Sequence, residues 1–252
     1  MSEKDLAHVM DEVDLLKKVD HPNIVEYFET YDDKHYLYLV MELCTGGELF
    51  DSHDEYIKND KPYSEKKAAD VIYKCLEALA HCHALGITHR DIKPENIMFG
   101  KDGEVRLVDF GLAKDTTHHM KSYAGTPYFM APEVLNGYYT HKCDIWSLAC
   151  VLYMLMGGKL PFTGTSRKEV FDKIKAGAYV APSHFSTELK SLLEQMFVTT
   201  PDDRPTAAEC KTHPWFKKLL HTDIVEEEVL STEVLAGLQQ FHGKNRLRRE
   251  CL

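Results

Sequence analysis

The sequence predicts an α+β fold in which a short mixed N-terminal part precedes a larger, mainly helical part. Strand-like alternation with aromatic residues is concentrated before residue 42 and in one short stretch near residue 100. Elsewhere apolar residues recur at three- and four-residue steps, the spacing of one face of a helix. With 252 residues, 44% of them hydrophobic and 28% charged, the chain is large enough for two lobes and has a normal globular composition.

The N-terminal part is predicted to contain one helix and one hairpin. Apolar residues at helical steps mark an amphipathic helix over residues 6–19, which ends before Pro22. Two runs of alternating and aromatic residues follow at 24–31 and 35–41. The polar residues 32–34 separate these runs, so the two strands are expected to pair as a hairpin.

The larger part is predicted to hold helices on both sides of a second, smaller hairpin. Ser64 is a candidate N-cap and Gly86 a candidate C-terminal stop for the first long helix. A capping-box pattern at 206–209 begins the last one. The expected elements are a helix over 64–86, a hairpin of 97–99 with 105–108, a buried helix over 145–156, a helix over 189–196 and a helix from Thr206.

Composition excludes several classes of function. Forty acidic and 30 basic residues give a net charge of -10, which argues against a general nucleic-acid or anionic-membrane binder. The most apolar run, 145–156, is shorter than the roughly 20 residues that cross a bilayer, so no membrane span is expected. Seven cysteines without a CxxC pair indicate free thiols in a reducing, cytoplasmic location. The histidine pairs His81/His83 and His118/His119 lack a second ligand cluster, so we expect solvated or capping side chains there.

The most informative segment is His-Arg-Asp-Ile-Lys-Pro-Glu-Asn at residues 89–96. Transfer of a phosphoryl group requires a carboxylate near the attacking hydroxyl, a cation near the moving phosphate, and oxygen ligands for Mg²⁺. Asp91 can supply the carboxylate and Lys93 the cation. Asn96 and Asp109 can supply the oxygen ligands, since the short hairpin between them returns the chain to the same place. The sequence therefore predicts a phosphoryl-transfer site with ATP and Mg²⁺ as cofactors.

This set of residues resembles the protein kinase family. The motif HRDxKxxN at 89–96, Asp-Phe-Gly at 109–111 and Ala-Pro-Glu at 131–133 occur in the family's order and spacing. The resemblance covers residues 6–216 and implies ATP-dependent phosphorylation of serine or threonine in proteins. It also implies the kinase fold, with a partial small lobe over 1–41, a large lobe with hinge over 42–216, and a junction or autoinhibitory-like helix over 217–252.

The resemblance places a nucleotide site around the hinge. Met41 falls at the gatekeeper position, and the backbone of Glu42 and Cys44 is expected to hold adenine. Met98 is expected to lie below the adenine, a role that is compatible with simple core packing. Glu48 is placed at the edge of the same site.

The resemblance also indicates the type of substrate. Lys93, and Thr126 within a Gly-Thr-Pro tripeptide, are typical of the serine/threonine branch, in which Thr126 hydrogen-bonds Asp91 and Lys93. Glu48 and Glu95 match positions that recognise arginine N-terminal to the target hydroxyl. Protein substrates with basic residues there are the expected partners. The alternative is that both glutamates are solvated surface carboxylates.

Other matching positions have structural roles in the family. Asp144 is expected to hold the backbone of the catalytic loop from a buried helix, and Glu133 is expected to pair with Arg204 in the large lobe. Loss of any of these three should cost stability as well as turnover. A stack of four side chains is expected to form the regulatory spine: Leu16, Tyr27, His89 and Phe110.

Two positions suggest regulation. Ser122 lies where many kinases carry an activating phosphate, and Arg90 is available to pair with that phosphate. Thr116 and Thr117 are the competing sites. Glu12 falls at the position of the helix glutamate that pairs with a strand lysine, or is an exposed glutamate without that role.

Part of the family's pattern is missing from these 252 residues. No GxGxxG loop occurs, and only eleven residues precede Glu12, so the phosphate-covering strands and their lysine are absent. A fragment, a partial gene product and a genuinely short form all fit this pattern. Activity of the chain itself is therefore doubtful, and the rival hypothesis is a non-catalytic kinase-like module that acts through its surface.

The C-terminal segment narrows the resemblance. Residues 230–252 resemble the start of the junction helix of calcium-dependent protein kinases of plants and protists, which implies a calmodulin-like EF-hand domain as a partner. The sequence contains no D-x-D-x-D-G loop, so no EF-hand is expected within it. Val234, Leu238 and Phe241 at helical steps, followed by a basic end, predict a groove-binding helix. A helix packed permanently on the large lobe is the alternative.

Overall fold

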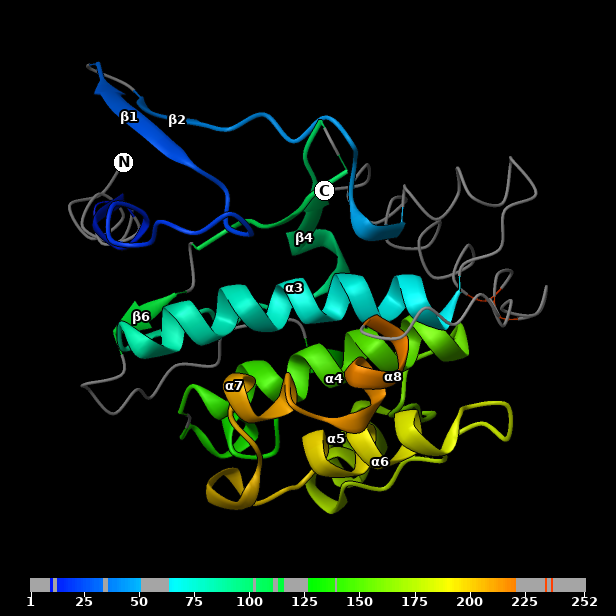
Figure 1. Ribbon diagram of the computed structural model, residues 1–252. Helices are drawn as coiled ribbons and strands as arrows, with labels where there is room; N and C mark the ends of the chain where they lie inside the picture. Colours follow the sequence, from blue (N-terminus) through cyan, green and yellow to red (C-terminus); the bar gives the residue numbers. More distant parts are fainter. Residues whose placement is uncertain are drawn as a thin grey trace.

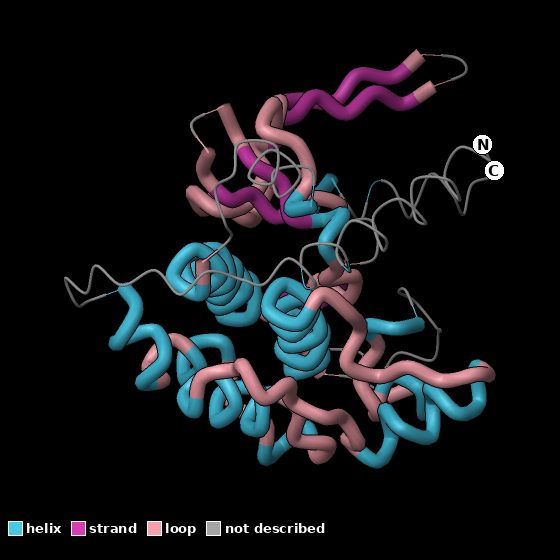
Figure 2. Tube along the Cα trace, turned by 90° about the vertical axis from the view of Figure 1, so that its right-hand side faces the viewer, coloured by secondary structure: helices cyan, strands magenta, loops and turns pink. Residues whose placement is uncertain are grey.

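The computed structural model describes most of the chain. The strands within residues 27–41 and 97–107 lie to one side of the helices that follow residue 65 (Figures 1 and 2). The residues described are 10, 13–33, 36–50, 64–101, 103–110, 113–115, 127–138, 140–220, 234 and 237.

The N-terminal part contains a helical turn and the predicted hairpin. Residues 13–16 are helical and are followed by a turn. Strand β1 (Tyr27–Asp32) pairs antiparallel with β2 (Leu37–Met41), with Thr30 opposite Leu39. The hairpin prediction is confirmed, but the first strand was expected to begin at residue 24. The backbone of Ile24 instead forms a parallel bridge with Leu107, so it belongs to another part of the fold.

Two further strand pairs position the loops of the site. Strand β4 (Ile97–Phe99) pairs with β5 (Val105–Leu107), which confirms the predicted small hairpin. Strand β3 (Ile87–Thr88) pairs with β6 (Lys114–Asp115) and brings the chain after residue 113 back beside the start of the catalytic loop. This second pair has no alternating pattern, because each strand is only two residues long.

The long helix α3 (Glu65–Ala84) begins and ends where the sequence predicts. The hydroxyl of Ser64 accepts a hydrogen bond from the Lys67 N–H, and Gly86 has a φ of 75° just after the last turn. One face of α3 is buried, and this face packs against the central helix α4 (Lys142–Gly157).

Helix α4 is the centre of the core. Every residue from 143 to 156 is buried, so the helix has no solvent-facing side. A helix that is apolar on all sides is a core helix, and its 16 residues are too few to span a bilayer. In the described part of the chain, no helix combines the length and apolar character that crossing a membrane requires.

The remaining helices are α5 (Arg167–Ala176), α6 (Thr187–Met196), α7 (Ala207–Cys210) and α8 (Pro214–Leu220). They lie on the side of α3 and α4 away from the hairpin β1–β2, with α7 and α8 against α3 and α6 against α4 (Figure 1). Helix α6 and the capping box of α7 confirm the predictions. Helix α5 was not predicted, because only Val170 and Ile174 are buried on it. Short 3-10 turns occupy Pro94–Asn96, Pro127–Phe129, Val134–Asn136 and Pro201–Asp203.

A buried carboxylate joins three of these helices. Oε1 of Glu65, at the start of α3, accepts hydrogen bonds from the Ser186 hydroxyl at 2.6 Å and from the Trp215 indole N–H. Ser186 also caps α6, and Trp215 belongs to α8. The ends of α3, α6 and α8 are therefore tied at one point.

Candidate active site

The predicted catalytic residues of one loop are close together. Nζ of Lys93 lies 2.5 Å from Oδ2 of Asp91, and both side chains are largely buried. Nδ2 of Asn96 donates to the backbone oxygen of Asp91 at 2.8 Å and to its Oδ2 at 3.2 Å. Since both amide hydrogens of Asn96 are used in this way, its Oδ1 is the atom left to bind a cation. The structure thus unites the predicted carboxylate, ammonium and amide.

Asp144 of α4 holds this loop by its backbone, as the resemblance implies. Its Oδ2 accepts from the His89 N–H at 3.0 Å, and its Oδ1 accepts from the Arg90 N–H at 2.8 Å. Arg90 has a φ of 69°, a left-handed conformation that is uncommon for a residue other than glycine. The bond from its N–H to the buried carboxylate helps to keep this strained backbone in place.

His83 completes the surroundings of Asp144. Nε2 of His83, near the end of α3, is 2.8 Å from Oδ2 of Asp144, and the imidazole ring lies 4.9 Å from that of His141. Burial acts to raise the pKa of Asp144, but the hydrogen bond and charge of His83, with the other donors, outweigh burial and lower it. The carboxylate therefore stays ionised with no solvent-exposed surface.

His89 is a neutral spacer between the two halves of the site. Its Nδ1 accepts from the Asp91 N–H at 3.3 Å, so Nε2 carries the proton and donates to the Val108 carbonyl at 3.1 Å. Burial lowers the pKa of His89, which agrees with this neutral tautomer. The ring also packs on Phe110 at 4.7 Å between centroids. The lower contact of the predicted spine is therefore present, whereas the stacking of Leu16 and Tyr27 on it stays a prediction.

Asp109 is brought to the catalytic loop by the small hairpin. The Val108 N–H donates to the Asn96 carbonyl at 3.0 Å, so Asp109 follows a residue that is bonded directly to the loop. Asp109 has a φ of 64°, the second left-handed non-glycine residue in the described chain. The two oxygen-bearing side chains predicted to bind Mg²⁺, those of Asn96 and Asp109, thus belong to segments joined by a backbone hydrogen bond.

The predicted nucleotide residues lie at the end of β2, in the segment after it and in β4. The carboxylate of Glu42 is 2.7 Å from Nε of Arg106, and its N–H donates to the Glu26 carbonyl at 2.8 Å. Met41 is exposed, Cys44 is half-buried, and Glu48 forms an antiparallel bridge with Met98. A side chain at Gly46 would place its Cβ 2.7 Å from Cβ of Phe99, so the close approach of this segment to β4 requires glycine.

The predicted large-lobe ion pair is present and buried. NH1 of Arg204 lies 2.7 Å from Oε1 of Glu133, and NH2 lies 3.0 Å from Oε2, which is a bidentate geometry. The guanidinium also lies over the ring of Trp146 at 5.1 Å from its centroid. For the two predicted substrate-recognition residues, the structure shows Glu95 in the 3-10 turn after Lys93 and Glu48 beside β4.

Several predicted positions lie outside the described residues. They are Glu12, Thr116, Thr117, Ser122 and Thr126, together with Leu238 and Phe241 of the tail. Two contributors were missed by the sequence reasoning. His83 was expected to be a solvated or capping side chain, but it is buried against Asp144, and Arg106 was not singled out. Neither could be found from local spacing, because their partners are 61 and 64 residues away.

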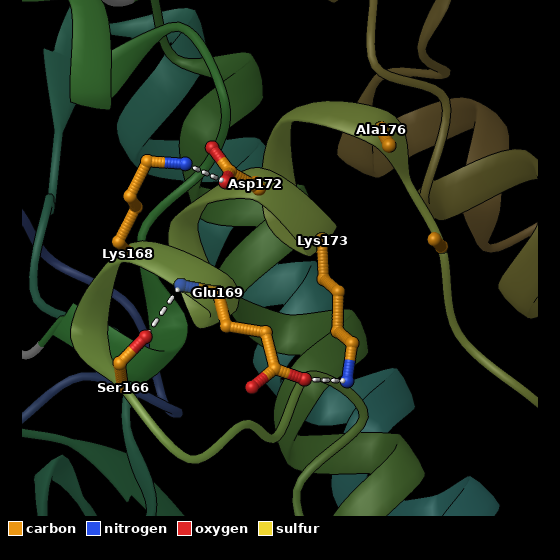
Figure 3. A pocket seen from close by; sticks show the side chains of 7 residues that line it. Ser166, Lys168, Glu169, Asp172, Lys173 and Ala176 are labelled. Carbon is orange, nitrogen blue, oxygen red and sulfur yellow. Dashed lines mark hydrogen bonds and ion pairs between the residues drawn. The ribbon is translucent and has the colours of Figure 1, made fainter.

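An open pocket elsewhere on the surface lies over α5 and takes no part in this site (Figure 3). Its charged side chains neutralise one another: Lys168 pairs with Asp172 at 2.8 Å, and Lys173 pairs with Glu169 at 2.9 Å. A surface whose charges are already paired offers little attraction to a charged ligand. We therefore place the candidate active site at the catalytic loop.

Comparison with known proteins agrees with this site. The model of the family described as "Protein kinase domain" matches residues 1–216. Calcium-dependent protein kinase 5 of Plasmodium falciparum is 35% identical over 94% of this chain and 43% of its own length. Calcium-dependent protein kinase 3 of Plasmodium yoelii yoelii is 38% identical, covering 85% and 41%. Sperm motility kinase 2B of the mouse is 41% identical, covering 82% and 43%.

These matches confirm the predicted resemblance and the α+β kinase fold. The chain spans less than half the length of these curated relatives.

Replacing Asp144 by Asn should weaken the catalytic loop. The asparagine NH₂ would face a backbone N–H, so at least one loop amide would lose its acceptor. We expect the free energy of unfolding at pH 7 to fall by about 1.5–3 kcal/mol, the usual worth of a hydrogen bond to a charged group. Urea denaturation would measure this loss, and Asp172→Asn at the exposed pair with Lys168 is the control, with a change within about 0.5 kcal/mol.

The difference in the free energy of unfolding between the parent and Asp144→Asn should depend on pH. Because folding lowers the pKa of Asp144, its stabilisation is fully present above the ordinary value of 3.8 and is lost as the pH falls through the lower folded value. The difference between the parent and Asp144→Asn should therefore shrink below about pH 4. A difference that stays constant down to pH 3 would contradict this account of Asp144.

Proposed function

The chain belongs to the protein kinase family, and from this premise we propose that it transfers the terminal phosphoryl group of ATP to serine or threonine in proteins. The observation that supports this proposal best is the grouping of Asp91, Lys93 and Asn96 on one loop, where Lys93 and Asn96 each contact Asp91 at 2.5–3.2 Å. Phosphoryl transfer depends mainly on positioning and electrostatic stabilisation. This loop supplies a carboxylate and an amide for the first and an ammonium group for the second.

Each residue of the loop has a distinct role in the proposed reaction. Asp91 orients the substrate hydroxyl and receives its proton, because it is the carboxylate nearest to the other two groups. Lys93 balances negative charge beside it. Asn96 fixes Asp91 through two hydrogen bonds from its amide nitrogen. The backbone beneath them is held by Asp144, so the three side chains keep their relative positions when substrate arrives.

The donor set fits Mg²⁺. Asn96 offers its Oδ1 and Asp109 its carboxylate, and hard oxygen ligands few in number are what Mg²⁺ prefers. When bound with ATP, the ion neutralises charge on the phosphate oxygens. We propose that these two residues hold the metal, and that the backbone of Glu42 and Cys44 together with Met41, Glu48 and Met98 surrounds the nucleotide.

We propose that substrates are proteins with basic residues before the target hydroxyl. Glu48 lies beside β4 and Glu95 lies in the 3-10 turn of the catalytic loop, so two carboxylates near the site would attract a basic peptide. Ser122 is proposed as the phosphorylated residue of the activation segment, if one is used, with Arg90 as the partner of its phosphate.

A second candidate function rests on the missing glycine loop. As a polypeptide of these 252 residues, the chain carries no GxGxxG and no strand lysine, which leaves ATP without its usual cover. A non-catalytic, kinase-like binding module is therefore the alternative for this polypeptide, while its catalytic loop retains all the required groups.

The 252-residue polypeptide should have little kinase activity on its own. ATP would lose the groups that position its phosphates, so we expect turnover well below the roughly 1–100 s⁻¹ of ordinary kinases. An assay with Mg-ATP and an arginine-containing peptide measures this. The comparison protein is a chimera in which residues 1–252 follow the glycine-loop strands of a complete kinase. Ordinary turnover by the polypeptide alone would disprove this prediction, and an inactive but folded chimera would favour the binding module.

In that chimera, Asp91→Asn should abolish transfer without unfolding the protein. Removal of a positioned proton acceptor costs roughly 10²–10⁴-fold in rate. Initial rates and thermal unfolding of the two proteins give the result, and Asp202→Asn on an exposed 3-10 turn is the control that should leave both unchanged. Near-normal turnover of Asp91→Asn would show that another residue receives the proton.

We further propose that residues 230–252 regulate the site in the whole protein. Apolar residues at helical steps followed by Lys244, Arg246, Arg248 and Arg249 form a segment of charge opposite to that of the acidic chain. Such a helix could occupy the place of a basic substrate and could also be bound by an EF-hand protein. The names of two relatives, which include calcium dependence, support this proposal.

Deleting residues 230–252 from the active chimera should raise its calcium-independent activity. A synthetic 230–252 peptide should inhibit the shortened protein, and Ca²⁺-loaded calmodulin should relieve that inhibition. Peptide assays with and without Ca²⁺ decide the matter, and a peptide with the four basic residues changed to alanine is the control. Unchanged activity after deletion, with no inhibition by the peptide, would leave the segment without a regulatory role.

A further inference from the structure

The end of α4 is closely covered by the C-terminal segment. Gly158 caps the helix with a φ of 67°, and its N–H donates to the Met154 carbonyl at 2.8 Å. A side chain at this position would collide with Val234: its Cβ would lie 2.8 Å from Cα of Val234 and closer still to the Val234 oxygen. The backbones of the two segments therefore meet with no room for a side chain.

The contact is reciprocal. A Cβ on Gly237 would lie 3.0 Å from the carbonyl carbon of Gly158 and nearer still to its oxygen. Val234 itself is only 5% exposed and belongs to the hydrophobic core of the molecule. Val234 and Gly237 are both helical and lie three residues apart, so they share one face of their helix. That face is the one in contact with Gly158.

The end of α4 at Gly157 and Gly158, called the Gly158 corner below, is itself held by neighbouring side chains. The His184 ring donates from Nε2 to the Met156 carbonyl at 3.1 Å, and the ring of Phe185 packs within 3.3 Å of the position of a Cβ on Gly157. Helix α4 then runs, fully buried, to Asp144 in its first turn. The corner and the support of the catalytic loop are thus the two ends of one rigid element.

We propose that the Gly158 corner is a permanent seat for the C-terminal segment, in which Val234 and Gly237 stay bound to the end of α4. This inference rests on the proposed regulation by residues 230–252 and refines it. A partner that binds the basic end of the segment would lift only the residues after Gly237 from the rest of the molecule. The anchor is specific, because Gly158 and Gly237 have no room for a side chain and Val234 is buried in the core.

The test compares two glycines of similar backbone conformation. Gly158→Ala and Gly137→Ala each place a side chain at a φ near 70°, but nothing lies within 4 Å of the Cβ position at Gly137. The strain of the left-handed backbone is therefore matched, and only Gly158→Ala displaces the segment. Amide hydrogen exchange of the peptide that contains Val234 and Gly237 is measured in the 252-residue chain, so that no kinase activity is needed.

We expect exchange in this peptide to be slow in the parent and in Gly137→Ala, and at least about tenfold faster in Gly158→Ala. Gly237→Ala, which leaves α4 untouched, should have the same effect as Gly158→Ala even if that variant folds poorly. Exchange in the parent as fast as in an unstructured 230–252 peptide, or slow exchange in both seat variants, would overturn the proposal.

A final experiment tests the anchoring of Val234 and Gly237 separately from the proposed calcium regulation. Ca²⁺-loaded calmodulin is added to the parent chain, and exchange of the same peptide should remain slow while calmodulin is bound. Rapid exchange at Val234 and Gly237 in the complex would overturn the permanent seat. Slow exchange without any binding of calmodulin would support the seat and count against the proposed calcium regulation.

Discussion

The geometry of the catalytic loop depends on one buried carboxylate. Asp144 accepts hydrogen bonds from two consecutive backbone amides of the loop, and one of these belongs to a residue with a strained, left-handed backbone. Burying an ionised carboxylate is costly unless it is well bonded, and His83 supplies a third close contact. The position of Asp91, and with it the arrangement of Lys93 and Asn96, follows from this bonding.

The same helix connects this carboxylate to the rest of the large lobe. The Ser147 hydroxyl donates to the Phe129 carbonyl at 2.8 Å and so ties α4 to the 3-10 turn Pro127–Phe129. Arg204 donates to the Lys142 carbonyl at the start of α4 while it pairs with Glu133. A fully buried helix with polar contacts at its N-terminal end can act as a rigid frame, because close-packed cores do not deform gradually.

The two halves of the molecule differ in how they are supported. Around α4 the side chains are buried, whereas both strands of the hairpin β1–β2 are largely exposed. A two-stranded hairpin is marginal by itself, and here it gains its support from contacts such as that of Ile24 with Leu107. The groups proposed for phosphoryl transfer are on the well-supported half, which explains why their loop is well formed although the covering strands are missing from these residues.

Local patterns predicted the parts of this protein that are built from neighbours in the chain. The cap at Ser64, the capping box at Thr206, the apolar run of α4 and the grouping of Asp91, Lys93 and Asn96 were all readable from spacing, because their interactions span few residues. Helix α5 was missed because only Val170 and Ile174 are buried on it. The contact of His83 with Asp144, the pairing of Ile24 with Leu107, and the seat of Val234 at Gly158 were decided by the tertiary structure alone. Each joins residues more than 60 positions apart. A local pattern of apolar and polar residues does not identify which distant residue will bond a buried charge, pair with a backbone amide or fill a gap in the core.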